Sequence, residues 1–398
     1  ETDVQNKDIS PSLLWKDGAQ SLLLQFDYQH QKRSIDFGVP GFNGSPLNVD
    51  PSTYYGAKNA YPNDYTESEV KSTTAQYKQK ISDTTSFTNT FRYFDYTLDR
   101  NHTRAISITG TVANPILNFQ RGNITRHEYG WFNQSEFTHD LTWGNTKHQL
   151  LTGVEFGEQN KYQYVNNAPA ASYYQTSLFN PVLPQNLPFT VATAPQSKGT
   201  AILSTQAAYI QDLITWTPQI KTLVGVRFDR FGQRYDNQIG ASLDRTDNAF
   251  SPRAGIVWQP TSTQSYYATA SKSFQPSGEG GAVAANNAQL APEKTQNLEV
   301  GTKIDLFNGA ASFNAAAYQL TRSDVKITDP NNTALLIPIG EQQTKGLELS
   351  LNGEIARGWQ MIASYSYMDG KVTKAVGNTT APLPCLLYTS DAADDTPC

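Results

Sequence analysis

The sequence predicts an all-β protein, a transmembrane antiparallel barrel of the outer-membrane type, on three observations. Apolar and polar residues alternate, as in residues 298–306, where Glu299, Lys303 and Asp305 oppose leucine, valine and isoleucine. An alternation with a period of two residues indicates a strand with two different faces. The polar face carries full charges in strand after strand, and short turns alternate with long loops. Lipid outside, a polar interior and unequal loops are typical of outer-membrane barrels.

Composition agrees with this fold class and excludes others. The 398 residues are 38% hydrophobic, with a mean hydropathy of −0.51 and 21 tyrosines. No apolar run approaches the ~18 residues of a membrane helix. A helical membrane protein is therefore excluded, whereas the alternation of a barrel dilutes its apolar residues. The net charge of −5 argues against a nucleic-acid partner.

The N-terminal half is predicted to alternate strands with two long loops. A turn at residues 16–18 leads to a strand around Leu22 and Leu24, and residues 31–69 are expected to form a polar loop. Strands follow at about 70–81 and 85–97, where Phe94 breaks the alternation. A loop through Arg100, Arg104 and Arg121 then leads to a clean strand that ends at Trp143. After a turn and a strand around Val154 and Phe156, residues 161–202 are expected to form the second long loop.

The C-terminal half is predicted to contain strand pairs at about 203–217 and 220–235, 248–259 and 265–275, and from Leu298 to Met368. A Gly-rich loop, 276–291, precedes the last group. Asn308-Gly309 marks a tight turn because this dipeptide adopts positive φ at little cost. The total is about fourteen strands, with no helical period and no domain linker.

Tryptophans gather beside the short turns. Indoles favour membrane interfaces, so we expect a periplasmic girdle, although strand ends favour Trp in any case. Trp131 lies near the opposite end of its strand. The girdle residues are Trp15, Trp143, Trp216, Trp258 and Trp359.

No catalytic or metal motif is present, and we expect no enzyme activity, no catalytic residue and no metal site. The five histidines lack ligand spacing, and His139, on an apolar side, is interpreted as an interface residue. The charges predicted to face the lumen mix both signs, which favours cross-strand ion pairs over a selectivity ring; contact with a polar plug is the alternative. They are Arg92, Glu136, Asp140, Glu155, Arg227, Asp229, Arg253, Glu299, Lys303, Asp305 and Glu348.

The aromatic-rich loops are the best candidates for ligand binding. Planar rings with a few arginines suit a flat, anionic, aromatic ligand. Packing of the loops on themselves and contact with lipopolysaccharide are the alternatives. The candidates are Tyr54, Tyr55, Tyr61, Tyr65, Arg100, Arg104, Arg121, Tyr162, Tyr164, Tyr173, Tyr174 and Phe179.

Both cysteines, Cys385 and Cys398, lie in a final segment without strand or turn pattern. We interpret 385–398 as a non-native tail and 1–384 as one barrel domain truncated at both ends; a disulfide between the two cysteines is the alternative.

Several motifs resemble the barrel of TonB-dependent siderophore receptors, and residues 32–40 resemble the catecholate-siderophore branch. The motifs are Leu290-x-Pro292-Glu293, Asn297-x-Glu299-x-Gly301-x-Lys303, Gly340-Glu341-Gln342, Lys345-Gly346-Leu347-Glu348, Gly358-Trp359 and Tyr365-Ser366-Tyr367-Met368-Asp369.

The resemblance implies a 22-stranded monomeric barrel in a bacterial outer membrane, of which this chain holds about 14 strands and no plug. It implies a ferric siderophore as ligand, with iron only as part of that ligand and no cofactor. It also implies coupling to the inner-membrane TonB complex through an N-terminal region, and contact with outer-membrane lipid. Uptake of haem, cobalamin or an oligosaccharide is the alternative within the class. A non-transporting adhesive or structural β-protein is the alternative outside it.

Overall fold

The computed structural model describes residues 4–35, 37–39, 41–42, 45–46, 49–50, 52–55, 64–111, 113–167, 174–182, 195–276, 290–328 and 336–374. Statements about structure below refer to these residues. Within them, no helix has the length and apolar character needed to cross a membrane. The predicted tail at 385–398, with both cysteines, lies outside them.

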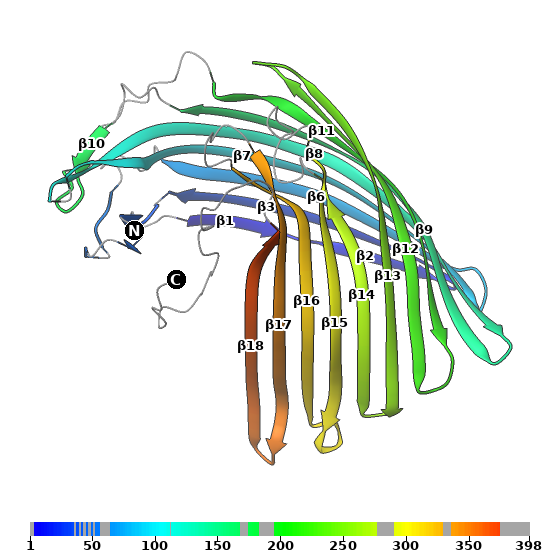
Figure 1. Ribbon diagram of the computed structural model, residues 1–398. Coiled ribbons are helices and arrows are strands. Elements are labelled where there is room, and N and C mark those ends of the chain that lie inside the picture. Colours follow the sequence, from blue (N-terminus) through cyan, green and yellow to red (C-terminus); the bar gives the residue numbers. More distant parts are fainter. Residues whose placement is uncertain are drawn as a thin grey trace.

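One antiparallel sheet of 16 strands forms almost the whole structure and curves into an open trough (Figure 1). Along the sheet the order is β1-β3-β6-β7-β8-β9-β11-β12-β13-β14-β15-β16-β17-β18; β2 pairs with β3, and β10 pairs with β8. This path contains the predicted number of strands. The strands are β1 (Val4–Ile9), β2 (Ser12–Asp17), β3 (Gln20–Ser34), β6 (Tyr65–Lys80), β7 (Thr85–Gly110), β8 (Pro115–Trp143), β9 (Thr146–Asn167), β10 (Tyr174–Ser177), β11 (Ser197–Thr215), β12 (Ile220–Asn237), β13 (Leu243–Thr261), β14 (Gln264–Gln275), β15 (Glu293–Leu306), β16 (Ala311–Thr328), β17 (Leu336–Ala356) and β18 (Trp359–Lys374), with a separate small pair, β4 (Gly41–Phe42) and β5 (Ser45–Pro46), and one 3-10 turn, η2 (Phe307–Gly309).

The ladder registers give the sheet two distinct faces. Ile210 stands beside Val226, and both are exposed apolar side chains. One residue along, Tyr209 stands beside Arg227 on the opposite face. We call the first the outer face and the second the inner face, because a curved sheet crowds the side chains on its concave side. The predicted alternation, apolar outside and charged inside, is confirmed.

Aromatic rings on the inner face lie over glycines of the neighbouring strand. A Cβ added to Gly153 would lie 2.4 Å from the ring of Tyr209, its register partner. The same relation explains Phe94, which broke the predicted alternation: it faces inward and stands beside Gly130. Glycine in a strand interior is weak by itself, and an aromatic ring over it restores packing. Further pairs are Phe132 with Gly157, Tyr267 with Gly301, and Tyr318 with Gly346.

The short turns occur where they were predicted. Asn308 has φ 57° and Gly309 has φ 86°, which is the left-handed backbone that the Asn-Gly dipeptide predicted. The turn predicted at residues 16–18 lies at residues 18–19, directly after β2, with Gly18 at φ 52°. Short connections therefore gather at one end of the sheet and the long ones at the other (Figure 1).

The predicted loops were too long, which is a correction. Arg100, Arg104 and Arg121 do not lie in a loop, because β7 and β8 pair as far as Gly110 and Pro115. Likewise, β6 begins at Tyr65, β9 extends to Asn167, β11 begins at Ser197, and β10 lies within the second predicted loop. Backbone pairing continues after the outer face stops being apolar, so hydrophobic alternation ends before the strand does.

Candidate functional site

Four arginines occupy the inner face near the end of the sheet that carries the long connections. Thr66 of β6 stands between Arg33 of β3 and Arg100 of β7 in a continuous row across three strands. Strand spacing places the two arginine Cα atoms about 10 Å apart. Arg104 lies four residues along the same strand on the same face, and Arg126 of β8 stands beside Leu98, diagonal to Arg100. We call Arg33, Arg100, Arg104 and Arg126 the arginine patch.

His102 lies between Arg100 and Arg104 on the same face and is 3% exposed. Its ring covers Gly122, its register partner on β8: an added Cβ there would lie 2.7 Å from the ring. Phe37 meets the ring edge-on, at 5.8 Å between centroids. Burial, together with the positive charge of Arg104, Arg100 and Arg121, lowers the pKa of His102 to about 4. The imidazole is therefore neutral at physiological pH, and its Nδ1 has no hydrogen-bond partner.

The patch is short of negative charge among the described residues. Arg100 donates from Nε to Thr66 Oγ1 at 3.1 Å, a neutral acceptor. The Nε of Arg126 is buried without a partner. The nearest inner-face carboxylate along β8 is Glu128, which stands beside Lys161 of β9. Guanidinium groups bind anionic groups through paired hydrogen bonds to two of their oxygens, so the patch is suited to an anionic ligand.

Of the three predicted binding arginines, Arg100 and Arg104 lie in this patch and Arg121 does not. Arg121 is one residue out of phase with Gln120, the partner of Arg104, so it starts from the other face of β8. Its Nη2 lies 2.9 Å from Asp64 Oδ1, and both side chains are almost fully buried. Asp64 also accepts a hydrogen bond from the Thr103 backbone N–H at 3.0 Å. Arg121 therefore has a structural partner already.

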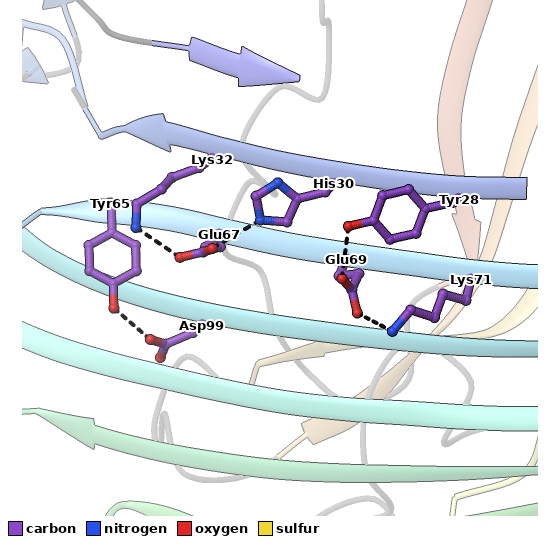
Figure 2. A network of polar contacts seen from close by, with 8 residues as sticks. All are labelled: Tyr28, His30, Lys32, Tyr65, Glu67, Glu69, Lys71 and Asp99. Carbon is purple, nitrogen blue, oxygen red and sulfur yellow. Dashed lines mark hydrogen bonds and ion pairs between the residues drawn. The ribbon is translucent and has the colours of Figure 1, made fainter. Parts of the chain in front are cut away.

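Tyr65, Tyr162 and Tyr164 lie on strands and on the outer face, away from the patch. Tyr65 donates its hydroxyl to Asp99 at 2.7 Å and belongs to a polar network across β3, β6 and β7 (Figure 2). Tyr164 stands beside Thr125 on the same face and accepts a hydrogen bond from Asn166. The network also contains Tyr28, His30, Lys32, Glu67, Glu69 and Lys71 (Figure 2).

Other predicted aromatics pack among themselves. Tyr55 is buried, and its hydroxyl donates to the carbonyl of Leu178 at 2.7 Å. Tyr174 of β10 packs against Phe119 of β8 within the same apolar cluster, which also contains Leu117. The packing of these two residues is of the kind that the alternative of loop self-packing describes. Tyr54 is half-buried, Phe179 is exposed, and Tyr61 and Tyr173 lie outside the described residues. Ligand contact by any of them stays a prediction.

The charged inner face is braced partly by ion pairs, as predicted, and partly by tyrosines. Arg227 Nη1 lies 3.1 Å from Glu155, and its Nη2 lies 2.9 Å from Asp229. Tyr209 donates to Glu136 at 2.8 Å and Tyr267 donates to Glu299 at 2.7 Å. Contact between this face and a plug stays a prediction.

The five predicted girdle tryptophans all lie next to short turns and are exposed. Trp15 and Trp258 share the outer face with Leu22 and Ile220, their register partners. Trp216 donates its indole N–H to Thr222 Oγ1 at 2.8 Å. Their position at a membrane interface stays a prediction; the set is Trp15, Trp143, Trp216, Trp258 and Trp359.

Sequence reasoning missed Arg33, Arg126 and His102 as site residues. Their position in the alternation of inward-facing and outward-facing residues along each strand could have identified them. Arg126 is separated by an even number of residues from Glu136, which was assigned to the interior. Within the described part of the chain, no group of three or more histidine, cysteine, aspartate or glutamate side chains could hold a metal ion.

The comparisons with known proteins agree with this geometry. The family model described as "TonB dependent receptor-like, beta-barrel" matches residues 9–385. The metal-pseudopaline receptor CntO of Pseudomonas aeruginosa is 30% identical over 249 residues, covering 61% of this chain and 34% of that protein. The probable TonB-dependent siderophore receptor PiuA of Acinetobacter baumannii is 25% identical, and the match covers 92% of this chain and 53% of that protein. The catecholate siderophore receptor Fiu of Escherichia coli K12 is 23% identical, and the match covers 94% of this chain and 56% of that protein.

Two solved structures show the same fold. The crystal structure of PiuA from Acinetobacter baumannii superposes with a TM-score of 0.82 at 23% identity, covering 94% of this chain and 57% of that chain. The closed form of the ferric-catecholate import receptor Fiu from Escherichia coli K12 superposes with a TM-score of 0.77 at 20% identity. The match covers 94% of this chain and 59% of that chain. The chain thus spans about half the length of most of these relatives, and about a third of CntO.

Proposed function

Because the chain belongs to the TonB-dependent receptor β-barrel family, we propose that it forms part of the wall of an outer-membrane receptor for the energy-coupled uptake of a ferric siderophore. The observation that carries the proposal is the two-faced sheet. Its outer face is apolar over the middle of the strands, with exposed Val154, Ile210 and Val226. Its inner face is charged and hydrogen-bonded. Such a wall separates lipid from a polar interior.

The ligand is proposed from the site and from the relatives together. PiuA and Fiu are named as siderophore receptors. The arginine patch lies on the inner face, where an anionic chelate that enters from the long-connection end would meet it. Iron would be present as cargo within the chelate, and no catalytic step is required of the wall. We further propose a monomeric barrel, contact of the outer face with outer-membrane lipid, and coupling to the TonB complex.

A second metal chelate class is favoured by one specific observation. CntO, which matches at 30% identity, is named as a metal-pseudopaline receptor. The cargo could therefore be a metal other than iron, held by a different anionic chelator. Competition between a ferric catecholate and a divalent-metal chelate for the same receptor separates the two classes.

The test is ligand loading of the purified full-length protein. We expect saturable binding of at least one ferric siderophore, and no binding of the chelator without metal at the same concentration. Binding of haem, cobalamin or an oligosaccharide, with no ferric chelate bound, would overturn the proposal. A folded barrel that binds a cell surface and no solute would favour the adhesive alternative.

A further inference from the structure

We propose that the outer face of the sheet carries a binding site for the phosphate group of an outer-leaflet glycolipid. The site is a row of three polar side chains on β11, β12 and β13. It consists of Gln206, Arg230 and Asn248, which are register partners on neighbouring strands, and we call it the donor row. The ligand is a membrane lipid and not the transported chelate, so this site is separate from the arginine patch.

The donor row lies where the apolar stretch of the outer face ends. Ala208, Phe228 and Phe250 form the last apolar row, and the donor row follows it on all three strands. From Ile220 to Phe228, β12 covers about 26 Å of strand, or about 20 Å of membrane thickness at the usual tilt, close to the ~25 Å apolar band of such barrels. Arg230 is therefore placed at the level of the lipid head groups, on the side of the long connections.

The side chains of the donor row have no acceptor within the protein. All three are exposed, and within the described part of the chain none makes a hydrogen bond or an ion pair. Arg230 offers a fork of N–H donors and a permanent charge, and the amide groups of Gln206 and Asn248 each offer a further NH₂ group. Because neighbouring strands lie about 5 Å apart, one phosphate can accept hydrogen bonds from more than one strand.

The outer-face cations on β3 and β6, by contrast, already have carboxylate partners. Lys32 Nζ lies 2.9 Å from Glu67, and Lys71 Nζ lies 2.6 Å from Glu69 (Figure 2). A bound phosphate there would have to displace a carboxylate, whereas at Arg230 it would neutralise a charge that has no partner. This difference places phosphate binding on β11 to β13 rather than on the network of Figure 2.

The rows on either side of the donor row suit the other parts of a glycolipid. On the membrane side, Phe250 is 70% exposed and packs against Phe228, with 5.0 Å between ring centroids, and offers an apolar surface to acyl chains. On the opposite side, the row of Ser204, Gly232 and Thr246 has only small side chains. A sugar ring can approach the backbone there, because no long side chain covers it.

The test is titration of the purified full-length protein, in detergent micelles, with lipid A, the phosphorylated glycolipid anchor of lipopolysaccharide. We expect saturable binding that weakens at high salt, and about tenfold weaker binding of lipid A from which the phosphates have been removed. Phosphatidylglycerol, which is anionic but has no sugar ring, should also bind about tenfold more weakly than intact lipid A.

Single variants locate the site. Arg230→Gln should weaken binding of lipid A about tenfold, the loss of one charge-assisted contact, and Arg230→Lys, which keeps the charge, should retain part of the affinity. The matched control is Arg253→Gln, the same change on the inner face of β13 beside Gly225, which should leave the affinity unchanged. Lys32→Gln, which removes a cation that already has a partner, should also leave it unchanged. The heat-modifiable mobility typical of folded barrels reports that each variant has folded.

The outcomes are distinguishable. Equal binding of lipid A by the wild type and by Arg230→Gln would overturn the assignment, as would an equal loss in Arg253→Gln. Equal affinity for lipid A and phosphatidylglycerol would show that the face recognises charge alone and would overturn the choice of a glycolipid. A loss confined to the Arg230 variants supports the site. Ferric-chelate binding by Arg230→Gln should equal that of the wild type, so failure of the proposed cargo leaves the lipid site standing, and the reverse.

Discussion

Arg121 and Asp64 form an ion pair in which the side chains are 4% and 3% exposed, with Nη2 2.9 Å from Oδ1. That carboxylate oxygen has no aligned hydrogen bond, so this contact is electrostatic. The other oxygen accepts the Thr103 amide. The pair therefore ties the segment before β6 to the distal ends of β7 and β8.

Removing one partner should loosen this end of the sheet. Arg121→Met would leave a buried carboxylate without a counter-charge, at a cost of about 3–5 kcal/mol in local stability. Amide hydrogen exchange at Thr103 should accelerate accordingly, and Asp64→Leu in the same chain should restore part of the protection. The control is Arg234→Gln, which breaks an exposed pair with Asp236 and should cost at most about 1 kcal/mol. Equal effects from both substitutions would contradict a structural role for the buried pair.

Acid should weaken the same region through His102. Its pKa is lowered to about 4 in the folded protein, so folding favours the neutral ring. The stabilisation is complete above the ordinary pKa of about 6.5 and is lost as the pH falls toward 4, at most about 3 kcal/mol. Proteolysis between β7 and β8 should therefore accelerate between pH 6.5 and 4.5.

A variant without the imidazole isolates this effect. Burial raises the pKa of Asp64, which acts in the opposite direction as the pH falls. His102→Gln keeps Asp64 and should lose the acid-dependent acceleration. If the variant and the wild type respond identically to pH, His102 is not the responsible group.

The ring-over-glycine pairs should stabilise the sheet. Gly153→Ala places a methyl group 2.4 Å from the ring of Tyr209, whose hydroxyl bonds to Glu136. We expect a loss of about 1–3 kcal/mol in the free energy of unfolding, measured by urea titration in detergent or vesicles. Gly255→Ala is the matched control, because the atom nearest to its added Cβ is Thr269 Cγ2, at 3.3 Å. A smaller loss at Gly153 than at Gly255 would refute the packing role.

A charged side chain placed on the outer face in the middle of a strand should destabilise the protein in a membrane. Val226→Arg should cost about 2–4 kcal/mol in vesicles if residue 226 lies near the bilayer midplane. Ser271→Arg, an exposed inner-face position on β14, should cost much less because it faces the polar interior. Equal costs at the two positions would mean that the outer face does not contact lipid.

The interior of each strand could be predicted from the sequence, and the strand ends could not. Between lipid and a polar lumen, side chains must alternate, and Val224 and Val226 with Arg227 and Asp229 show that pattern directly. Beyond the apolar stretch both faces of β7 and β8 are polar or covered by other segments. There the ladder continues through Arg100 and Arg121 without a hydrophobic signal.

The site was only partly predictable for a related reason. Parity along β8 separates Arg121 from Arg126, and parity along β7 places Arg100 and Arg104 on one face, so the sequence contains that information. The row that brings Arg33 beside Thr66 and Arg100 depends on the register between three strands. Loop lengths and long-range pairing set this register, so no local pattern reports it. Tyr65, predicted in a loop, is an outer-face strand residue for the same reason.

The most direct test of the receptor assignment is the uptake of radioactive iron by cells whose only siderophore receptor is the full-length protein. We predict accumulation of iron from a ferric siderophore in energised cells, and surface binding without accumulation when the TonB complex is absent. Iron entry that is equal with and without the TonB complex, or a protein that binds no ferric chelate, would contradict the account.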